Sequence, residues 1–308
     1  MSVRTILVSA AHRAALCSGY SLRRARRQPV RRIFMLHGVC DADFPAQVLE
    51  RNLTWLGRHF RIVSLDEIVC GLASGAPPDG EVALTFDDGL RNHFRVAYPV
   101  LRRLRAAATF FVCPGLIDHG QWLWNHESRA RLKALTPERR TGLARSMGCA
   151  RADADGVVEW MKSLGPDERS RAEAEIRGAT PAFAPSDGDR LRFDPMTWEE
   201  LRELDPALIT IGSHTMTHPI LSTVDDACLQ HELAQSRARL ESELGRAVEF
   251  FCFPNGANDA RVRAAAARVY RAAVTTRPGS LEGRVDLHGL PRLSMPESDA
   301  TLAWRMWR

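Results

Sequence analysis

Lysine is nearly absent from this chain of 308 residues, and no acidic residue occurs near its start. Of 42 basic residues only Lys133 and Lys162 are lysines, and arginine makes up the rest. Together with a similar bias towards alanine, this is more typical of codon composition than of a nucleic-acid-binding surface. Hydrophobic residues account for 45% and charged residues for 26%, which excludes a disordered or collagen-like chain. A chain of this length can bury one large α/β core or two ordinary ones.

Paired cysteines are also missing. The seven cysteines are odd in number and widely spaced, and no two of them form a Cys-x-x-Cys pair. This pattern argues against zinc ribbons, thioredoxin chemistry and a disulfide framework. We therefore expect reduced, buried thiols and a cytoplasmic location.

Long apolar runs are absent as well. No run approaches the roughly 18 residues that a membrane-spanning helix needs. The apolar run that begins after Arg4 is interrupted by His12 and Arg13, which argues against a signal peptide. The sequence thus predicts a chain without a transmembrane segment.

Positive charge is concentrated at the start of the chain. The net charge is +5, and the first 32 residues hold eight arginines and no acid, so that the remainder is slightly acidic. We interpret residues 1–30 as a basic helical arm and residues 31–308 as the main domain. The arm is most simply a solvated helix and linker, although peripheral contact with an anionic membrane surface remains open. No recognition motif supports nucleic-acid binding, and we expect no such partner.

Short runs of β-forming residues alternate with helical patterns. The segment 225–245 has leucines at helical spacing and Gly245 where a helix should end. Strands that alternate with helices predict parallel pairing and an α/β layered or barrel fold. Residues 126–190 interrupt this alternation with helical sequence only, and we interpret them as a helical insertion. The predicted strands are 32–37, 61–65, 81–86, 108–113, 208–213, 248–253 and 272–276.

Polar residues follow four of these strands, at the point where each strand ends. Because the carboxyl ends of parallel strands meet at one edge of the fold, we expect these residues to lie together. They are Asp87 and Asp88 after 81–86, His214 and His218 after 208–213, Pro254, Asn255 and Gly256 after 248–253, and His37 after the first strand.

Two imidazoles and one carboxylate would form a three-ligand site for a divalent metal, with positions left for water and substrate. His214 and His218 are four residues apart, and Pro219 directly after them favours a strand-to-loop turn over a long helix. Taken singly, such a histidine pair is more often structural, and Asp-Asp-Gly is more often a turn or a helix cap. Their joint placement after strands favours the metal site.

The segments TFDDG, SHTMTHP and FPNG, in this order, resemble the first three motifs of the polysaccharide deacetylase family with the NodB homology domain, carbohydrate esterase family 4. The resemblance extends over residues 30–295, roughly, and includes WEEL at Trp198 and LPRLS at 290–294. The leading FMLHGV and the long helical insert are similar to a branch found with bacterial exopolysaccharide and glycan biosynthesis. The resemblance implies a distorted (β/α)7 TIM-like barrel with a helical insertion.

The same resemblance implies roles for individual residues. Asp88, His214 and His218 would be the metal ligands, and Asp87 the general base that takes a proton from the attacking water. A cation at Asp88 would offset the repulsion between the two adjacent carboxylates, so that Asp87 stays ionised. Zinc suits this ligand set best, while cobalt, nickel or manganese can take the same ligands. A general acid must also protonate the departing sugar amine.

The sequence departs from the family pattern at two points. The arginine of the third motif, which orients the catalytic carboxylate, is replaced by Cys252, and Arg292 in LPRLS is the candidate substitute, with an ordinary surface arginine as the alternative. The late Leu-x-x-His motif, which supplies the general acid, is approximated only by His288 in VDLH. His37 could instead serve as this acid, line the substrate pocket, or be a structural histidine.

Substrate contacts are predicted at the same edge. Flat apolar rings suit pyranoses, and Trp124 is the best placed of Trp122, Trp124 and Trp198 to stack on a sugar, although core packing is commoner for tryptophan. His37 and the turn Pro254-Asn255-Gly256 complete the predicted substrate-binding set.

The sequence therefore predicts a metal-dependent hydrolase that removes N-acetyl groups from amino sugars of a polysaccharide or glycan precursor. Two alternatives remain open at this stage. The same residues could hydrolyse a formamide, a cyclic imide or another small amide, or the chain could be a catalytically silent glycan-binding protein.

Overall fold

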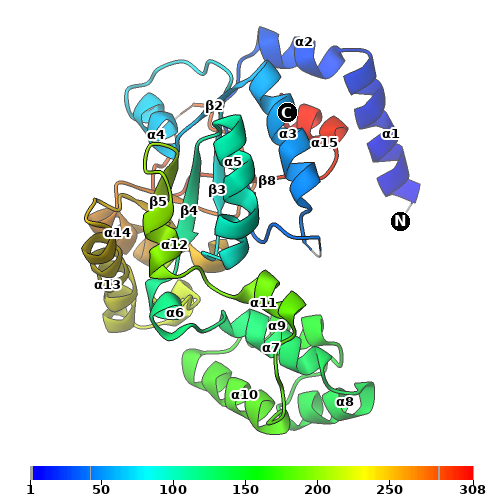
Figure 1. Cartoon of the computed structure of the whole chain (residues 1–308), viewed down its shortest axis with the longest axis vertical. Coiled ribbons are helices and arrows are strands. Elements are labelled where there is room, and N and C mark those ends of the chain that lie inside the picture. The colour runs from blue at the N-terminus through cyan, green and yellow to red at the C-terminus, as the bar shows by residue number, and fades with distance from the viewer. Residues whose placement is uncertain (1–2, 42, 284, 308) are drawn as a thin grey trace.

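The computed structural model describes residues 3–41, 43–283 and 285–307, so that the first two residues of the predicted arm lie outside the described part. Its centre is a curled sheet of parallel strands with helices packed around it (Figure 1). This is the predicted distorted (β/α)7 barrel, and all seven predicted strands are present with ends shifted by a few residues. The strands are β1 Arg32–Leu36, β2 Arg61–Val63, β3 Glu81–Phe86, β4 Ala108–Val112, β5 Ile209–Ser213, β6 Phe250–Cys252, β7 Ala272–Val274 and β8 Leu293–Ser294.

The sheet has the strand order β7-β6-β5-β4-β3-β1-β8, with β2 beside β3, and every pair is parallel. Strand β8 pairs with β1, and Leu290 just before it forms a parallel bridge to Val274 of β7. Segment 290–294 thus lies between β7 and β1. The sequence did not predict β8, because two residues after Pro291 are too few for a recognisable pattern.

Strand β3 is buried along its whole length because it lies in the middle of the sheet. Val82, Leu84 and Phe86 join the large core beneath the outer helices, whereas Ala83 joins a second cluster on the opposite face. This alternation fixes the direction in which the residues after β3 leave the strand.

The helices around the sheet follow the sequence pattern closely. The helix predicted at 225–245 spans Asp226–Leu244 and ends at Gly245, whose φ of 63° is the left-handed conformation that favours glycine. This helix is α13. The other helices of the barrel are α3 Ala46–His59, α4 Leu65–Ala73, the π-turn His93–Ala97, α5 Tyr98–Leu104, α6 Pro114–His119, α12 Trp198–Glu203, α14 Ala260–Val269 and α15 Asp299–Arg305.

Five helices between β4 and β5 form a separate lobe, and residues 114–208 contain no strand (Figure 1). This lobe, called the insertion below, has its own apolar core, which includes Leu132, Val157 and Ile176. Asn92 ties it to the barrel: its Oδ1 accepts from Val39 N at 2.9 Å, and its Nδ2 donates to the carbonyls of residues 191 and 192 at 3.2 Å. The helices are α7 Trp124–Lys133, α8 Pro137–Ser146, α9 Ala154–Met161, α10 Pro166–Ala179 and α11 Asp187–Phe193.

The basic arm forms two helices, α1 Val3–Cys17 and α2 Tyr20–Arg27, which pack against α15 at the other end of the chain (Figure 1). The imidazole of His12 stacks on Trp304 at 4.7 Å between ring centroids, and Tyr20 meets Trp307 edge-on at 5.5 Å. The described residues of the arm therefore pack against the end of the chain through these aromatic contacts. None of the described helices combines the length and apolarity needed to cross a bilayer.

Candidate active site

The two adjacent aspartates after β3 differ in backbone conformation, although both carboxylates lie close to His214. Asp87 N still donates to Leu36 O at 2.9 Å, which continues the sheet. Asp88 then adopts φ 78° and Gly89 φ 63°, and a Cβ on Gly89 would lie 2.8 Å from the side chain of Val112. A non-glycine residue in the left-handed region costs free energy, so the surrounding structure must hold Asp88 in this orientation.

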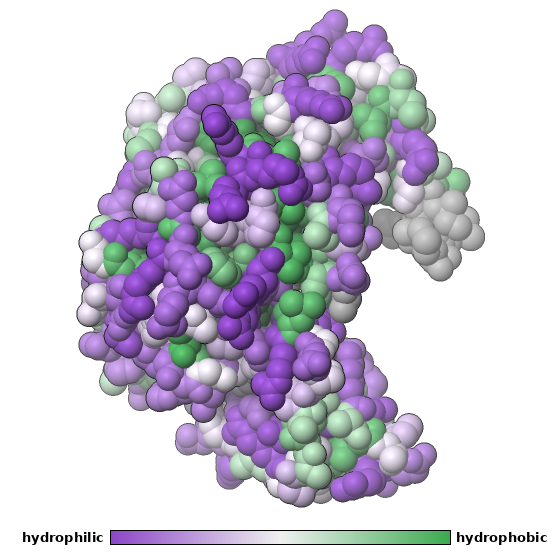
Figure 2. All heavy atoms as spheres, viewed as in Figure 1, coloured by the Kyte–Doolittle hydropathy of each residue, from purple (hydrophilic) through white to green (hydrophobic). Residues whose placement is uncertain are grey.

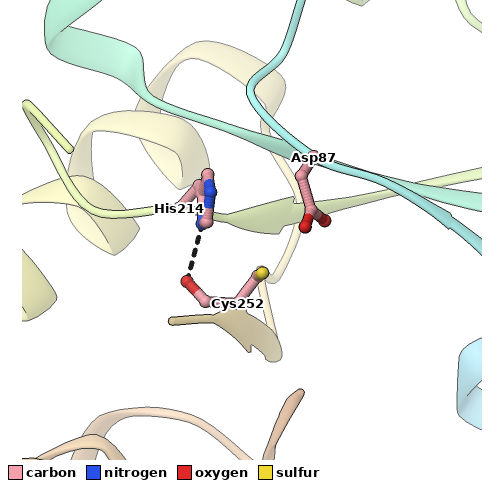
Figure 3. A group of neighbouring side chains, drawn as sticks. All are labelled: Asp87, His214 and Cys252. Atoms are coloured by element: carbon pink, nitrogen blue, oxygen red, sulfur yellow. Dashed lines mark hydrogen bonds between the residues drawn. The ribbon is translucent and has the colours of Figure 1, made fainter. Parts of the chain in front are cut away.

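The loop after β5 presents both predicted histidines to Asp88. His214 Nδ1 donates to the carbonyl of Cys252 at 2.7 Å, which leaves its Nε2 for the opposite side (Figure 3). His218 has φ 62°, and its backbone N donates to Thr215 Oγ1 at 2.9 Å. The buried carboxylate of Glu232 accepts from the backbone N–H groups of residues 216 and 217, at 2.7 and 3.0 Å, and fixes the loop.

Asp88, His214 and His218 converge as the sequence predicted. The Nε2 atoms of His214 and His218 each lie 3.5 Å from Asp88 Oδ1, and the three ligand atoms lie within 4.8 Å of one another. Ligands at about 2.0–2.1 Å around a tetrahedral zinc ion are separated by about 3.3 Å, so this donor set fits a metal ion in both chemistry and spacing. The Nδ1 atom of His218 is buried and has no hydrogen-bond partner among the described residues.

The electrostatics of the triad favour a cation. Burial alone would raise the pKa of Asp88, but the hydrogen bond from His214 and the neighbouring imidazoles lower it well below its usual range. Burial and the charge of His214 lower the pKa of His218 to about 3, so this imidazole is neutral and free to coordinate. Burial opposes a proton on His214, yet Cys252 and Asp88 outweigh it and raise its pKa well above 6.5. The carboxylate thus draws positive charge to this point, and a divalent cation would replace that proton.

Asp87 is held by Arg292, the predicted substitute for the missing motif arginine. Arg292 donates from Nη1 to Oδ1 and from Nη2 to Oδ2, both at 2.7 Å, in a fully buried bidentate pair. It also donates from Nε to Thr275 O and from Nη1 to Thr85 Oγ1, each at 2.8 Å. Burial would raise the pKa of Asp87, but the charge and hydrogen bonds of Arg292 outweigh it and lower the pKa to about 2. An arginine directly before β8 therefore reaches the carboxylate that the motif position would serve.

Asp87, His214 and Cys252 also lie close together, and Figure 3 shows the carboxylate and the sulfur beside the imidazole. These three residues do not suit a metal ion, because Arg292 already binds both oxygens of Asp87 and donates to Cys252 Sγ at 3.1 Å. Burial raises the pKa of the Cys252 thiol, which further disfavours the thiolate that a metal requires. The Asp88 triad is the better metal site.

His37 lies where the predicted acid or pocket residue should be. Its Nε2 is 4.0 Å from Asp87 Oδ2, and 53% of its side chain is exposed. Its carbonyl accepts from Nε2 of the fully buried His93 at 2.8 Å, which fixes the end of β1. The ring opens into a cavity of about 500 Å³ between the barrel and the insertion, where Figure 2 shows the molecule hollowed. Other residues that line this cleft include Asp43, His126, Arg129, Arg192 and Phe193.

His126 was not predicted as a site residue, although the structure brings it there. It belongs to the first turn of α7 in the insertion, and its Nε2 lies 4.0 Å from Asp88 Oδ2. Burial lowers its pKa to about 4. The sequence offered no signal, because His126 has no ligand spacing to the other histidines and its position depends on how the insertion packs.

Two predicted site residues are not at the site. His288 hydrogen-bonds through Nε2 to Tyr270 O at 2.9 Å, just before the amino end of β7, whereas the aspartates follow the carboxyl end of β3. The prediction of His288 as the general acid is therefore wrong in its geometry. Trp124 is only 6% exposed: it packs in the core of the insertion, Arg169 covers its ring, and its Nε1 donates to His218 O at 3.3 Å. This indole supports the histidine loop and has no open face for a sugar.

The turn Pro254–Gly256 lies at the carboxyl end of β6 as predicted. Asn255 has φ 54°, and its carbonyl accepts from Thr276 Oγ1 at 3.2 Å. A Cβ on Gly256, with φ 68°, would lie 1.9 Å from Thr276 Oγ1, so only glycine fits. Contact of Pro254, Asn255 and Gly256 with a substrate stays a prediction.

A sequence model of the family described as polysaccharide deacetylase matches residues 74–273. No curated protein matches the chain significantly in sequence. Among solved structures, the chain is similar to the deacetylase PplD of Streptococcus pyogenes in complex with acetate, with 18% identity, a TM-score of 0.61 and coverage of 91% of this chain and 98% of that chain. It is also similar to IcaB from Ammonifex degensii (16%, 0.60, 90% and 97%) and to the deacetylase domain of BpsB from Bordetella bronchiseptica (18%, 0.56, 86% and 95%). At these identities the similarity shows the fold.

Proposed function

The chain belongs to the polysaccharide deacetylase family, hydrolases that act on carbon–nitrogen bonds of carbohydrates, and we propose that it is a metal-dependent enzyme that removes N-acetyl groups from amino sugars of a glycan or glycan precursor. The observation that carries this proposal is the convergence of Asp88, His214 and His218 on one point, with Asp87 beside them and held by a different partner. An open cleft lies beside this point, lined by His37 and His126, whose Nε2 atoms are each 4.0 Å from one of the two aspartates.

Asp88, His214 and His218 would hold the cation, and zinc fits their ligand types best. A divalent cation in this position supplies Lewis acidity, which activates water and polarises an amide carbonyl. Cobalt, nickel and manganese can use the same three side chains.

Asp87 is the proposed general base. Its bidentate pair with Arg292 keeps the carboxylate ionised and fixes its orientation, so that one face can accept a proton from the attacking water. Because Arg292 neutralises Asp87, the two neighbouring carboxylates do not compete for the same cation.

His37 is the proposed general acid, since it faces Asp87 across 4.0 Å and opens into the cleft. We expect His37→Gln to lower kcat by about 10²–10⁴-fold while the protein retains its metal and its fold. His288→Gln is the matched control, because this histidine is bonded to Tyr270 O away from the cleft and should leave kcat unchanged. Equal losses in the two variants, or none in either, would refute the assignment of His37.

The function itself is tested by acetate release from N-acetylated hexosamine oligosaccharides, measured with the metal-loaded protein, after chelation, and after return of zinc. We expect acetate release to disappear on chelation and to recover with zinc. Release of formate from formamides or opening of a cyclic imide, without acetate release, would identify a different amide hydrolase. Metal binding and oligosaccharide binding without hydrolysis of any amide would identify a glycan-binding protein.

A further inference from the structure

We propose that His126, on helix α7 of the insertion, positions Asp88 by donating its Nε2–H to the Oδ2 oxygen of that carboxylate when a cation occupies the triad. The inference rests on the metal site of the proposed function, and it gives the insertion a direct part in that site. His126 acts here on a ligand and not on the substrate, so it is a positioning residue.

The two oxygens of Asp88 face different partners. Oδ1 faces the Nε2 atoms of His214 and His218 at 3.5 Å each, whereas Oδ2 faces Nε2 of His126 at 4.0 Å. Within residues 3–41, 43–283 and 285–307 no hydrogen bond is donated to Oδ2, and this oxygen keeps a little contact with solvent while 5% of the Asp88 side chain is exposed. A carboxylate that binds a metal through one oxygen usually needs a hydrogen-bond donor on the other. His126 is positioned to provide it.

The position of His126 suits a hydrogen-bond donor to Asp88 better than a fourth metal ligand. The three ligand atoms of the triad lie within 4.8 Å of one another. No nitrogen of His126 lies within this distance of two other ligand atoms of the described residues that are themselves this close. Its Nδ1 is buried without a partner among the described residues. In a neutral imidazole, hydrogen on Nε2 leaves Nδ1 as a lone pair, and a buried acceptor without a partner is more readily tolerated than a buried N–H. This tautomer points the hydrogen towards Asp88.

The insertion holds the ring in place. The imidazole packs against Phe193 at 4.7 Å between ring centroids, and only 14% of the His126 side chain is exposed. Phe193 ends α11, next to the carbonyls of residues 191 and 192 that accept from Asn92 of the barrel. A 4.0 Å separation exceeds a hydrogen bond by about 1 Å, so a small approach of α7 to the barrel completes it. Metal binding and docking of the insertion are thereby coupled.

The test measures zinc affinity of the full chain without substrate, by competition with a chromophoric chelator. The variants are His126→Phe, which keeps an aromatic ring against Phe193, and His126→Gln, which keeps an N–H donor. His231→Phe is the control, because His231 is exposed on α13. We expect His126→Phe to weaken zinc binding by about 10–100-fold, with Gln within about threefold of the wild type and the control unchanged. Thermal unfolding of the metal-free proteins verifies that each variant is folded.

Three outcomes would overturn the inference. Wild-type affinity in His126→Phe would overturn the inference. Equal weakening in the Phe and Gln variants, with an altered absorption spectrum of the cobalt-loaded Gln variant, would make His126 a direct ligand and overturn its positioning role. If the wild type itself binds no metal, the proposed function fails first, and the inference with it.

Discussion

Asp87→Asn is expected to lower the rate of amide hydrolysis by about 10²–10⁴-fold, which is the usual contribution of a positioned general base. The amide keeps the size of the carboxylate but removes its charge and its capacity to accept a proton, so that Arg292 retains a single acceptor there. Because Asp87 pairs with Arg292 and not with the triad, the variant should still bind one metal ion per chain. Initial rates of acetate release, normalised to metal content, measure the effect.

Asp88→Asn is the matched control for Asp87→Asn, since the two positions are adjacent and differ only in their partners. We expect Asp88→Asn to lose the metal together with activity, because Oδ1 of Asp88 faces both histidines. Full activity in Asp87→Asn, or loss of metal from both variants to the same extent, would contradict the separate roles of the two aspartates.

Arg292→Met is expected to reduce the free energy of unfolding by about 3–5 kcal/mol, because it leaves the Asp87 carboxylate buried without its partner. The side chains of Arg292 and Asp87 are 0% and 2% exposed, so water cannot replace the lost bonds. The pKa of Asp87 should rise at the same time, and with it the pH below which activity is lost. Denaturant unfolding and a pH–rate profile measure the two effects.

The double variant Asp87→Asn with Arg292→Met distinguishes a broken pair from a general packing defect. With both charges gone, it should be more stable than Arg292→Met alone. Arg277→Met serves as the surface control and should change stability by less than about 0.5 kcal/mol, because Arg277 is exposed. A loss below 1 kcal/mol in Arg292→Met would show that the buried pair does not hold Asp87.

The metal triad could be predicted from sequence because each ligand follows a strand that is recognisable by its own pattern. Asp88 follows β3 and the histidines follow β5, and parallel strands bring such positions to one edge whatever their distance in sequence. Arg292 was proposed on other grounds, as the substitute for the family's motif arginine that Cys252 replaces. It lies directly before β8, which is too short to recognise in the sequence, so its contact with Asp87 could only be proposed.

The remaining contacts depend on packing that no local pattern encodes. His126 reaches Asp88 only because a lobe of five helices docks against the barrel through Asn92 and Phe193. His288 failed as a prediction for the opposite reason. The segment that resembles the family's late motif lies before Leu290, where the chain is still near the amino end of β7. The imidazole of His288 therefore hydrogen-bonds to Tyr270 O and lies outside the cleft.

Trp124 shows a further source of error. Its place after β4 suggested an exposed sugar platform, but the insertion that starts at this residue needs an apolar core of its own. The indole packs in that core, and its N–H donates a hydrogen bond to the carbonyl of His218. Cytoplasmic location, the arm at 1–30 as a separate unit, and membrane contact through that arm stay predictions.

Anomalous X-ray scattering from zinc-loaded crystals tests the central claim most directly. We predict a single strong peak bonded to Asp88, His214 and His218, with Asp87 still paired to Arg292 and making no bond to the ion. A peak that involves Asp87 or Cys252 in place of Asp88, or no peak among these side chains at full zinc occupancy, would contradict the account.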